Sequence, residues 1–328
     1  MRTLKRRLLS VAGVCTLAVA MLGLWPVWLV GSVFFDIVRG KFRCPTARLL
    51  AFATCWAWIE VGGVVASAVL FVAGQRNNRN AHYGLQRSWA GALMSALRWT
   101  VGLRVHVRNP EVLRPGPVIV LSRHASLADS LVSAWAVGNV AKLQPRYVLK
   151  RELMSDPCLD IVGHRLPNYF LDRGSNNQSE ELRGLAQLGS NLGEHDVAVI
   201  FPEGTRTNAA KRQRILDEMA KRSPERAERL ASLHHLLPPK PSGALALMEA
   251  APHADIVIAG HTGFDGLGTF RGMLRRLENG GGAGEMWFVR VPRSAVPSDG
   301  LTRWLDDRWV ELDRAVADEL EKDEQHDR

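Results

Sequence analysis

The sequence predicts an α/β fold, with a mixed, largely parallel sheet flanked by helices and an N-terminal two-helix membrane segment. Short apolar runs, such as residues 118–121 and 197–201, alternate with longer segments of helical periodicity. This alternation is typical of strands joined by helical crossovers. The first quarter of the chain instead carries long uncharged stretches. With 46% hydrophobic and 23% charged residues among 328, the chain is not disordered in bulk.

The N-terminal quarter is predicted to lie in a membrane. Residues 8–35 contain no Asp, Glu, Lys or Arg. This run is well beyond the ~20 apolar residues that a bilayer-spanning helix needs. Pro26 is expected to kink it. A second apolar run, 49–73, is interrupted by Glu60 and by the Gly62–Gly63 pair. We expect residues 1–75 to form a membrane-embedded helical hairpin and residues 76–328 a separate domain.

The topology of this hairpin stays open at the level of sequence. Basic residues lie before the first run, between the two runs and after the second, so the excess of positive charge does not choose between two spans and a re-entrant pair. Either arrangement returns the second domain to the side of the N-terminus, which we expect to be the cytoplasmic face. Because the apolar run continues beyond a signal-like segment at 18–20, a cleaved signal peptide is disfavoured.

The overall charge points to an anionic partner. The net charge is +9 and the pI is near 9.8, which suits a phospholipid surface or nucleic acid. Since the basic residues are dispersed and partly flank the apolar runs, a membrane is predicted and nucleic acid is not. The four cysteines lack paired spacing, so they are expected to be free thiols and no metal site is predicted.

From residue 88 onward the expected elements follow in order. Predicted strands are 103–107, 118–121, 147–149, 168–171, 197–201, 255–259 and 287–291, and predicted helices are 88–101, 127–140, 150–162, 179–192, 243–249 and 301–322. A charge-rich helical insertion is expected at about 208–237, and the glycine run at 280–284 is interpreted as a hairpin or linker loop.

A histidine and an aspartate follow the apolar run at 118–121. His124 and Asp129 are five positions apart, which on one continuous helix would separate them by roughly 140°. They can therefore touch only if His124 lies on the loop after the strand and Asp129 in the first turn of the next helix. There the carboxylate would accept the Nδ1 proton and leave Nε2 as a base. An isolated pair at this spacing is more often a simple strand-to-helix turn.

A second motif favours a catalytic role for this pair over a simple strand-to-helix turn. Residues 201–206 read F-P-E-G-T-R, directly after another apolar run. Together with His124 and Asp129, and with Phe170 and Arg173 between them, this motif resembles the glycerolipid acyltransferase family over about residues 117–261. The apolar run at 256–258 occupies the place of the fourth conserved block of that family.

The resemblance implies transfer of an acyl group from acyl-CoA or acyl-carrier protein to a lysophospholipid hydroxyl, most simply of lysophosphatidic acid. It implies a general base, His124, oriented by Asp129, and no cofactor besides the thioester co-substrate. The residues implied to hold the phosphate and glycerol are Arg173, Glu203, Gly204, Thr205 and Arg206, with Phe170 and Lys240 as further candidates. Glu203 is expected to bind a glycerol hydroxyl or to pair with a basic residue.

Some features depart from the family pattern. Arg123 precedes the histidine where asparagine is common, the fourth block lacks its usual proline, and the insertion at 208–237 is long. The long insertion resembles enzymes that act on lysocardiolipin or lysophosphatidylinositol, which are alternative acceptors. A non-catalytic, basic, membrane-anchored lipid-binding protein is the alternative of another class. A serine hydrolase is disfavoured because no G-x-S-x-G motif is present.

Overall fold

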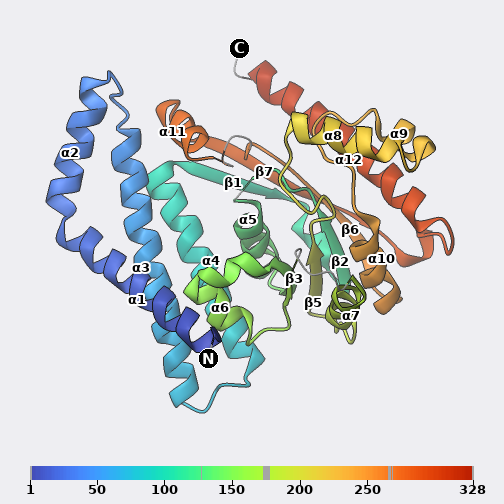
Figure 1. Ribbon diagram of the computed structural model, residues 1–328, viewed down its shortest axis with the longest axis horizontal. Coiled ribbons are helices and arrows are strands. Elements are labelled where there is room, and N and C mark those ends of the chain that lie inside the picture. The colour runs from blue at the N-terminus through green and yellow to red at the C-terminus, as the bar shows by residue number, and fades with distance from the viewer. Residues whose placement is uncertain (1, 127, 173–177, 265–266, 268, 327–328) are drawn as a thin grey trace.

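The chain folds around one central sheet, as the computed structural model shows (Figure 1). The structure describes residues 2–126, 128–172, 178–264, 267 and 269–326. Within these residues the sheet has seven strands in the order β1-β7-β6-β2-β5-β3-β4. The predicted α/β class with a mixed, largely parallel sheet is therefore confirmed.

The strands fall into a parallel group and a reversed pair. Strands β6, β2, β5, β3 and β4 run parallel to one another, whereas β7 pairs antiparallel with β6 and parallel with β1. β2 occupies the centre, between β5 and β6. The bounds are β1 Leu103–Arg108, β2 Val118–Ser122, β3 Gln144–Lys150, β4 Tyr169–Leu171, β5 Asp196–Ile200, β6 Asp255–Thr262 and β7 Gly282–Val291.

The central strand is buried on both faces, as its unbroken apolar run predicts. Val118 and Val120 face one hydrophobic core, and Ile119 and Leu121 face the other. None of the four is exposed to solvent. Because β2 is enclosed in this way, its carboxyl end is a rigid position from which to present a side chain.

Helices cover both faces of the sheet. The first core contains residues of α4 and α5, and the second contains residues of α7, α9, α10 and α12. The bounds are α4 Arg79–Ala96, α5 Asp129–Trp135, α6 Pro157–Gly163, α7 Gln178–Gly189, α8 Ala209–Ala220, α9 Pro224–Leu230, α10 Pro241–Ala250, α11 Phe270–Glu278 and α12 Leu301–His326. The charge-rich insertion thus contains α8 and α9, which lie beside α12 in Figure 1.

The glycine run at 280–284 was wrongly expected to be a loop. Strand β7 begins at Gly282 and includes most of that run. A Cβ added at Gly284 would lie 2.1 Å from the Phe264 ring, and one at Gly281 would lie 2.8 Å from the Gly102 carbonyl oxygen. Glycine is needed here because neighbouring groups approach the backbone closely. The amphipathic helix α11, which precedes β7, was not predicted.

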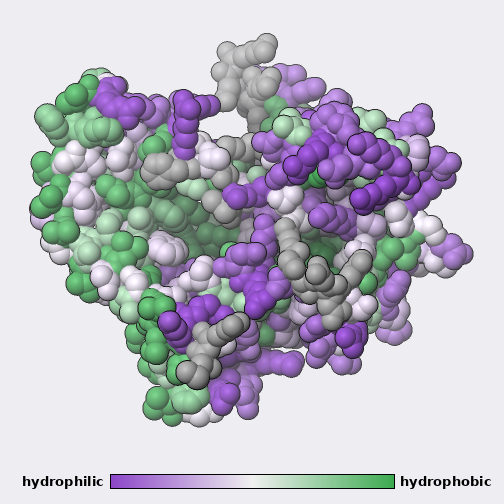
Figure 2. Space-filling view, in the orientation of Figure 1, coloured by the Kyte–Doolittle hydropathy of each residue, from purple (hydrophilic) through white to green (hydrophobic). Residues whose placement is uncertain are grey.

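The N-terminal segment contains α1 Arg2–Gly23, α2 Trp25–Val38 and α3 Pro45–Val72. The first apolar run is broken at Leu24, with Pro26 in the first turn of α2. Among the described residues, the stretches 3–23 and 45–72 are long and apolar enough to cross a membrane. Many of their large apolar side chains are exposed, and hydrophobic surface gathers over these helices whereas hydrophilic surface gathers over α8 and α9 (Figure 2).

Helix α3 packs against the sheet domain along most of its length. Near its start, Arg48 Nε donates to the Thr100 carbonyl at 2.8 Å. In its middle, Glu60 accepts hydrogen bonds from Trp89 Nε1 at 2.8 Å and from the Cys158 amide at 3.2 Å. Near its end, Arg165 donates to the Ser67 carbonyl at 3.0 Å. The buried carboxyl of Glu60 therefore joins α3 to both α4 and α6.

Candidate active site

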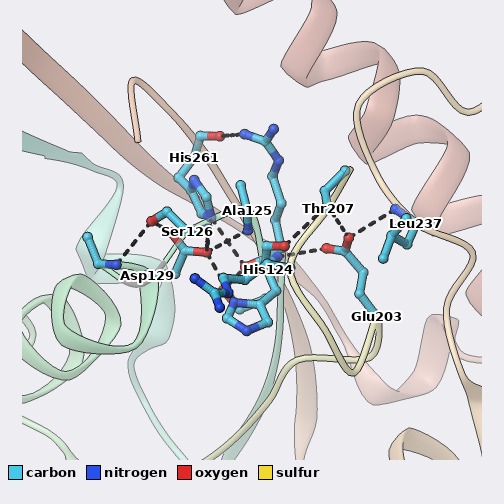
Figure 3. Close-up of polar contacts among 12 residues, drawn as sticks. His124, Ala125, Ser126, Asp129, Glu203, Thr207, Leu237 and His261 are labelled. Atoms are coloured by element: carbon cyan, nitrogen blue, oxygen red, sulfur yellow. Dashed lines mark hydrogen bonds and ion pairs between the residues drawn. The ribbon is translucent and has the colours of Figure 1, made fainter. Parts of the chain in front are cut away.

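His124 lies on the loop between the end of β2 and the start of α5, and Asp129 is the first residue of α5. The imidazole Nδ1 and the Asp129 Oδ2 are 3.2 Å apart (Figure 3). The His124 ring also packs against the Phe201 ring, with 4.8 Å between centroids. Engagement of Nδ1 leaves Nε2 as the nitrogen available to a substrate hydroxyl.

Asp129 is 2% exposed and is held as a carboxylate by several donors. Its Oδ2 accepts from the Ala125 amide at 2.6 Å and from the Ser126 amide at 2.7 Å, and Ser126 Oγ donates to Oδ1. Burial alone would raise the pKa of Asp129, but the nearby imidazoles of His261 and His124 and the bonds from Ser126 lower it to about 2. Asp129 is therefore ionised at neutral pH.

Glu203 supports the other side of the same loop. Its carboxylate is fully buried and accepts from the His124 amide at 2.7 Å, from Thr207 Oγ1 at 2.6 Å and from the Leu237 amide at 2.9 Å (Figure 3). Glu203 is not among the residues that line the cavity described below. These contacts differ from the expected glycerol contact, and they favour a positioning role for Glu203 through the His124 backbone.

The burial of Glu203 predicts a specific pH dependence of stability. Burial raises its pKa to about 7, although bonds from Thr207, Leu237 and His124 oppose the change. Between about pH 4.5 and 7, Glu203 then loses its proton in the unfolded chain but keeps it in the folded protein. The free energy of unfolding therefore falls as pH rises through this window, by at most about 3 kcal/mol from this residue. Glu203→Gln has no such titration. The wild-type melting temperature should therefore fall relative to that of Glu203→Gln between pH 5 and pH 8. A difference independent of pH would contradict this account.

The F-P-E-G-T-R motif forms a turn after β5. Gly204 has a φ of +71°, a conformation that favours glycine, and a Cβ placed there would lie 3.4 Å from the Lys240 side chain. Lys211, on the inserted helix α8, donates from Nζ to Thr205 Oγ1 at 3.1 Å and to the Arg206 carbonyl at 2.9 Å. The insertion thus helps to hold the turn that carries Arg206, a role the sequence did not reveal.

One cavity of about 860 Å³ joins the histidine to the basic residues. His124, Gly204, Arg206 and Lys240 all line it. Much of its remaining wall is apolar and comes from α4, α6 and the turn after α6, including Leu85, Trp89, Cys158, Leu159, Val162 and Leu166. A cavity with an imidazole, cationic side chains and a long apolar wall can hold an amphiphilic anion beside a base.

Two further candidate site residues are Arg173 and Phe170. Arg173 falls outside the described residues. Phe170 stacks on the His164 ring at 4.4 Å between centroids and is not among the lining residues. Among the residues that the structure describes, no group of three or more His, Cys, Asp or Glu side chains is arranged to hold a metal ion.

Comparison with known proteins agrees with the motifs. The profile of the family described as Acyltransferase matches residues 104–261, which include the His124–Asp129 pair and the turn with Arg206. Residues 104–261 therefore resemble an acyltransferase domain. The chain is 26% identical to the mouse (Mus musculus) 1-acyl-sn-glycerol-3-phosphate acyltransferase epsilon over 212 residues, covering 61% of this chain and 57% of that relative.

A solved structure shares the fold of this chain. It is the 1-acyl-sn-glycerophosphate (LPA) acyltransferase PlsC from Thermotoga maritima, with a TM-score of 0.50 and 14% sequence identity. The similarity covers 80% of this chain and 94% of that one. At this level of identity the similarity shows a shared fold.

Proposed function

We propose that this protein transfers an acyl group from an acyl thioester, carried by coenzyme A or by acyl-carrier protein, to the free hydroxyl of lysophosphatidic acid. The observation that carries the proposal is the single cavity that His124, Arg206 and Lys240 line together. An imidazole and a guanidinium in separate cavities would not act on one lysophospholipid. The mouse relative, whose name specifies 1-acyl-sn-glycerol-3-phosphate, supports this acceptor.

The proposed reaction uses the substrate hydroxyl as the nucleophile. His124 Nε2 takes the hydroxyl proton as the oxygen attacks the thioester carbonyl, and Asp129 stabilises the imidazolium that forms. The tetrahedral intermediate collapses by breaking its C–S bond, and the leaving thiolate takes the proton from His124. The amides of Ala125 and Ser126 already donate to Asp129, so other groups must stabilise the oxyanion.

The cationic side chains are proposed to hold the acceptor phosphate. Arg206 presents a planar guanidinium that binds phosphate oxygens bidentately, and Lys240, whose side chain lies close to Gly204, adds a second charge. The absence of a side chain at Gly204 lets the ligand approach the backbone of the turn. Arg173 and Thr205 complete the proposed phosphate and glycerol contacts. The apolar wall from α4 and α6 would hold an acyl chain.

The proposed reaction can be tested with purified protein in detergent micelles. Oleoyl-CoA, or oleoyl-acyl-carrier protein in a parallel series, is supplied with lysophosphatidic acid, lysophosphatidylinositol, monolysocardiolipin or lysophosphatidylcholine. Thiol release and product mass are measured. We expect the highest kcat/KM with lysophosphatidic acid, because its phosphomonoester offers the most charge to Arg206 and Lys240. Preference for lysophosphatidylinositol or monolysocardiolipin would move the protein to the alternative acceptors. No turnover with CoA or carrier-protein thioesters would refute the enzymatic proposal in favour of lipid binding alone.

We also propose that residues 1–75 embed in one leaflet of a membrane rather than crossing it. The contacts of α3 at Arg48 and Ser67 are 19 residues apart, or about 28 Å along the helix, and both join it to the sheet domain. A perpendicular span would draw part of that polar domain into the lipid. All basic flanks would then share the face of the catalytic domain, proposed to be cytoplasmic.

This placement predicts the accessibility of the α2–α3 turn. In a variant without the four native cysteines, Phe42→Cys in the turn and Asp299→Cys in the catalytic domain are each reconstituted into sealed vesicles. An impermeant maleimide should label both positions from the same side. Labelling of the two positions from opposite sides would contradict the one-leaflet arrangement.

A further inference from the structure

The ends of β2 and β6 are joined by a reciprocal pair of contacts between Arg123 and His261. The Arg123 guanidinium donates to the His261 carbonyl, and the His261 ring Nε2 lies 3.2 Å from the Arg123 carbonyl. The Arg123 amide also donates to the Ala259 carbonyl at 3.0 Å. Both side chains are buried, at 2% and 1% exposure.

The His261 ring also faces the carboxylate that orients His124. His261 Nε2 is 3.6 Å from Asp129 Oδ2, the oxygen that contacts His124 Nδ1 (Figure 3). The Phe264 ring packs against His261, with 5.2 Å between centroids. Asp129 therefore has an imidazole on each side, one from the loop after β2 and one from β6.

We propose that His261, held in place by Arg123, is a positioning residue that sets the basicity of His124 through their shared carboxylate. This inference rests on the proposed function in that it takes His124 as the base. The His261 Nε2–H donates to the Arg123 carbonyl, and the same nitrogen lies 3.6 Å from Asp129 Oδ2. This polar N–H offsets part of the negative charge on Asp129, so that less charge stabilises the His124 imidazolium. The result is a base whose conjugate acid gives up its proton readily to the leaving thiolate.

Other charged groups around the pair have fixed places. Arg123 comes from the end of β2 and His261 from β6, and Glu203, from the turn after β5, binds the amide of His124. The α5 side contributes Asp129 itself and the hydroxyl of Ser126 just before it. Among these described groups, His261 is the titratable side chain that approaches Asp129 without contacting the cavity.

The inference predicts a shift in the pH dependence of kcat/KM. His261→Leu removes the ring donor, so His124 should bind its proton more tightly and the acid limb should move up by about 0.5–1 pH unit. His261→Gln keeps an N–H at similar reach and should restore the wild-type limb. The KM for the lysophospholipid should change less than twofold in either variant. His253→Leu, in an exposed position before β6, is the matched control and should behave as wild type.

A second readout separates this inference from the proposed function. The pKa of His124 is measured by NMR of ring-labelled histidine in the wild type and in each variant, which requires no turnover. Should His261→Leu fail to fold, His261→Asn, whose shorter side chain withdraws the donor, replaces it and should show the same upward shift. Lower stability with an unmoved His124 titration, or a Gln variant as impaired as Leu, would overturn the inference and leave His261 a structural residue. An inactive wild type would instead refute the proposed function.

Discussion

His124→Ala should lower kcat by a factor of about 10²–10⁴, because it removes the group that takes the proton from the attacking hydroxyl. The ring is 7% exposed and its described side-chain contacts are with Asp129 and Phe201. The fold should persist, since Glu203 binds the backbone amide of residue 124 rather than its ring. The measurement is thiol release from oleoyl-CoA at saturating lysophosphatidic acid, with circular dichroism to verify folding.

The matched control for that variant is His106→Ala. His106 lies on β1 with its side chain 75% exposed, far along the sheet order from β2. Its replacement should leave kcat unchanged. If His124→Ala kept more than a third of wild-type kcat, the histidine would not be the base and the reaction would need another proton acceptor.

Asp129→Asn should reduce kcat by about 10³-fold and also destabilise the protein. The amide keeps the shape of the carboxylate but has one acceptor oxygen, whereas Asp129 receives the amides of Ala125 and Ser126 as well as the Ser126 hydroxyl. Without the negative charge at residue 129, the tautomer of the His124 ring is no longer fixed. Since hydrogen bonds to charged groups contribute about 1.5–3 kcal/mol each, we expect the free energy of unfolding to fall by about 2 kcal/mol or more at pH 7.

The stability difference between wild type and Asp129→Asn should depend on pH in the acid range. Because the folded pKa of Asp129 is lowered to about 2 from 3.8, its stabilisation is complete above pH 4 and is lost as pH falls toward 2. Melting temperatures at pH 7 and pH 3 measure this, with the exposed Asp299→Asn as control. A variant that retained wild-type kcat, or a stability gap that widened on acidification, would contradict the assigned role of Asp129.

The sequence predicted the central strand and the placement of its functional side chains with little help from tertiary contacts. An uninterrupted apolar run at 118–121 had to be buried on both faces, and the five-residue spacing allowed His124 and Asp129 to meet only across a strand-to-helix turn. The structure has that turn.

Other features were decided by contacts between distant segments. Most of the glycine run at 280–284 lies in β7, and Phe264 and Gly102 approach the backbone of the run closely. No local sequence pattern predicts such an approach. Glu203 was expected to bind a glycerol hydroxyl or to pair with a basic residue; the sequence did not reveal that the amides of His124 and Leu237 donate to its buried carboxylate. Arg123 was recognised as unusual in sequence, but its connection to His261 depends on β6 lying beside β2.

By itself, then, the amino-acid sequence determined where the sheet is buried, which residues follow its central strand and that the N-terminal quarter is apolar. Hydrophobic periodicity and chain stiffness act over a few residues, so a linear pattern records them. Only the tertiary structure decided which donors surround Asp129 and Glu203, and which groups share the cavity with His124. These contacts depend on the order of strands in the sheet, which decides which segments lie side by side. Buried polar groups form hydrogen bonds with whichever partners the fold brings within reach.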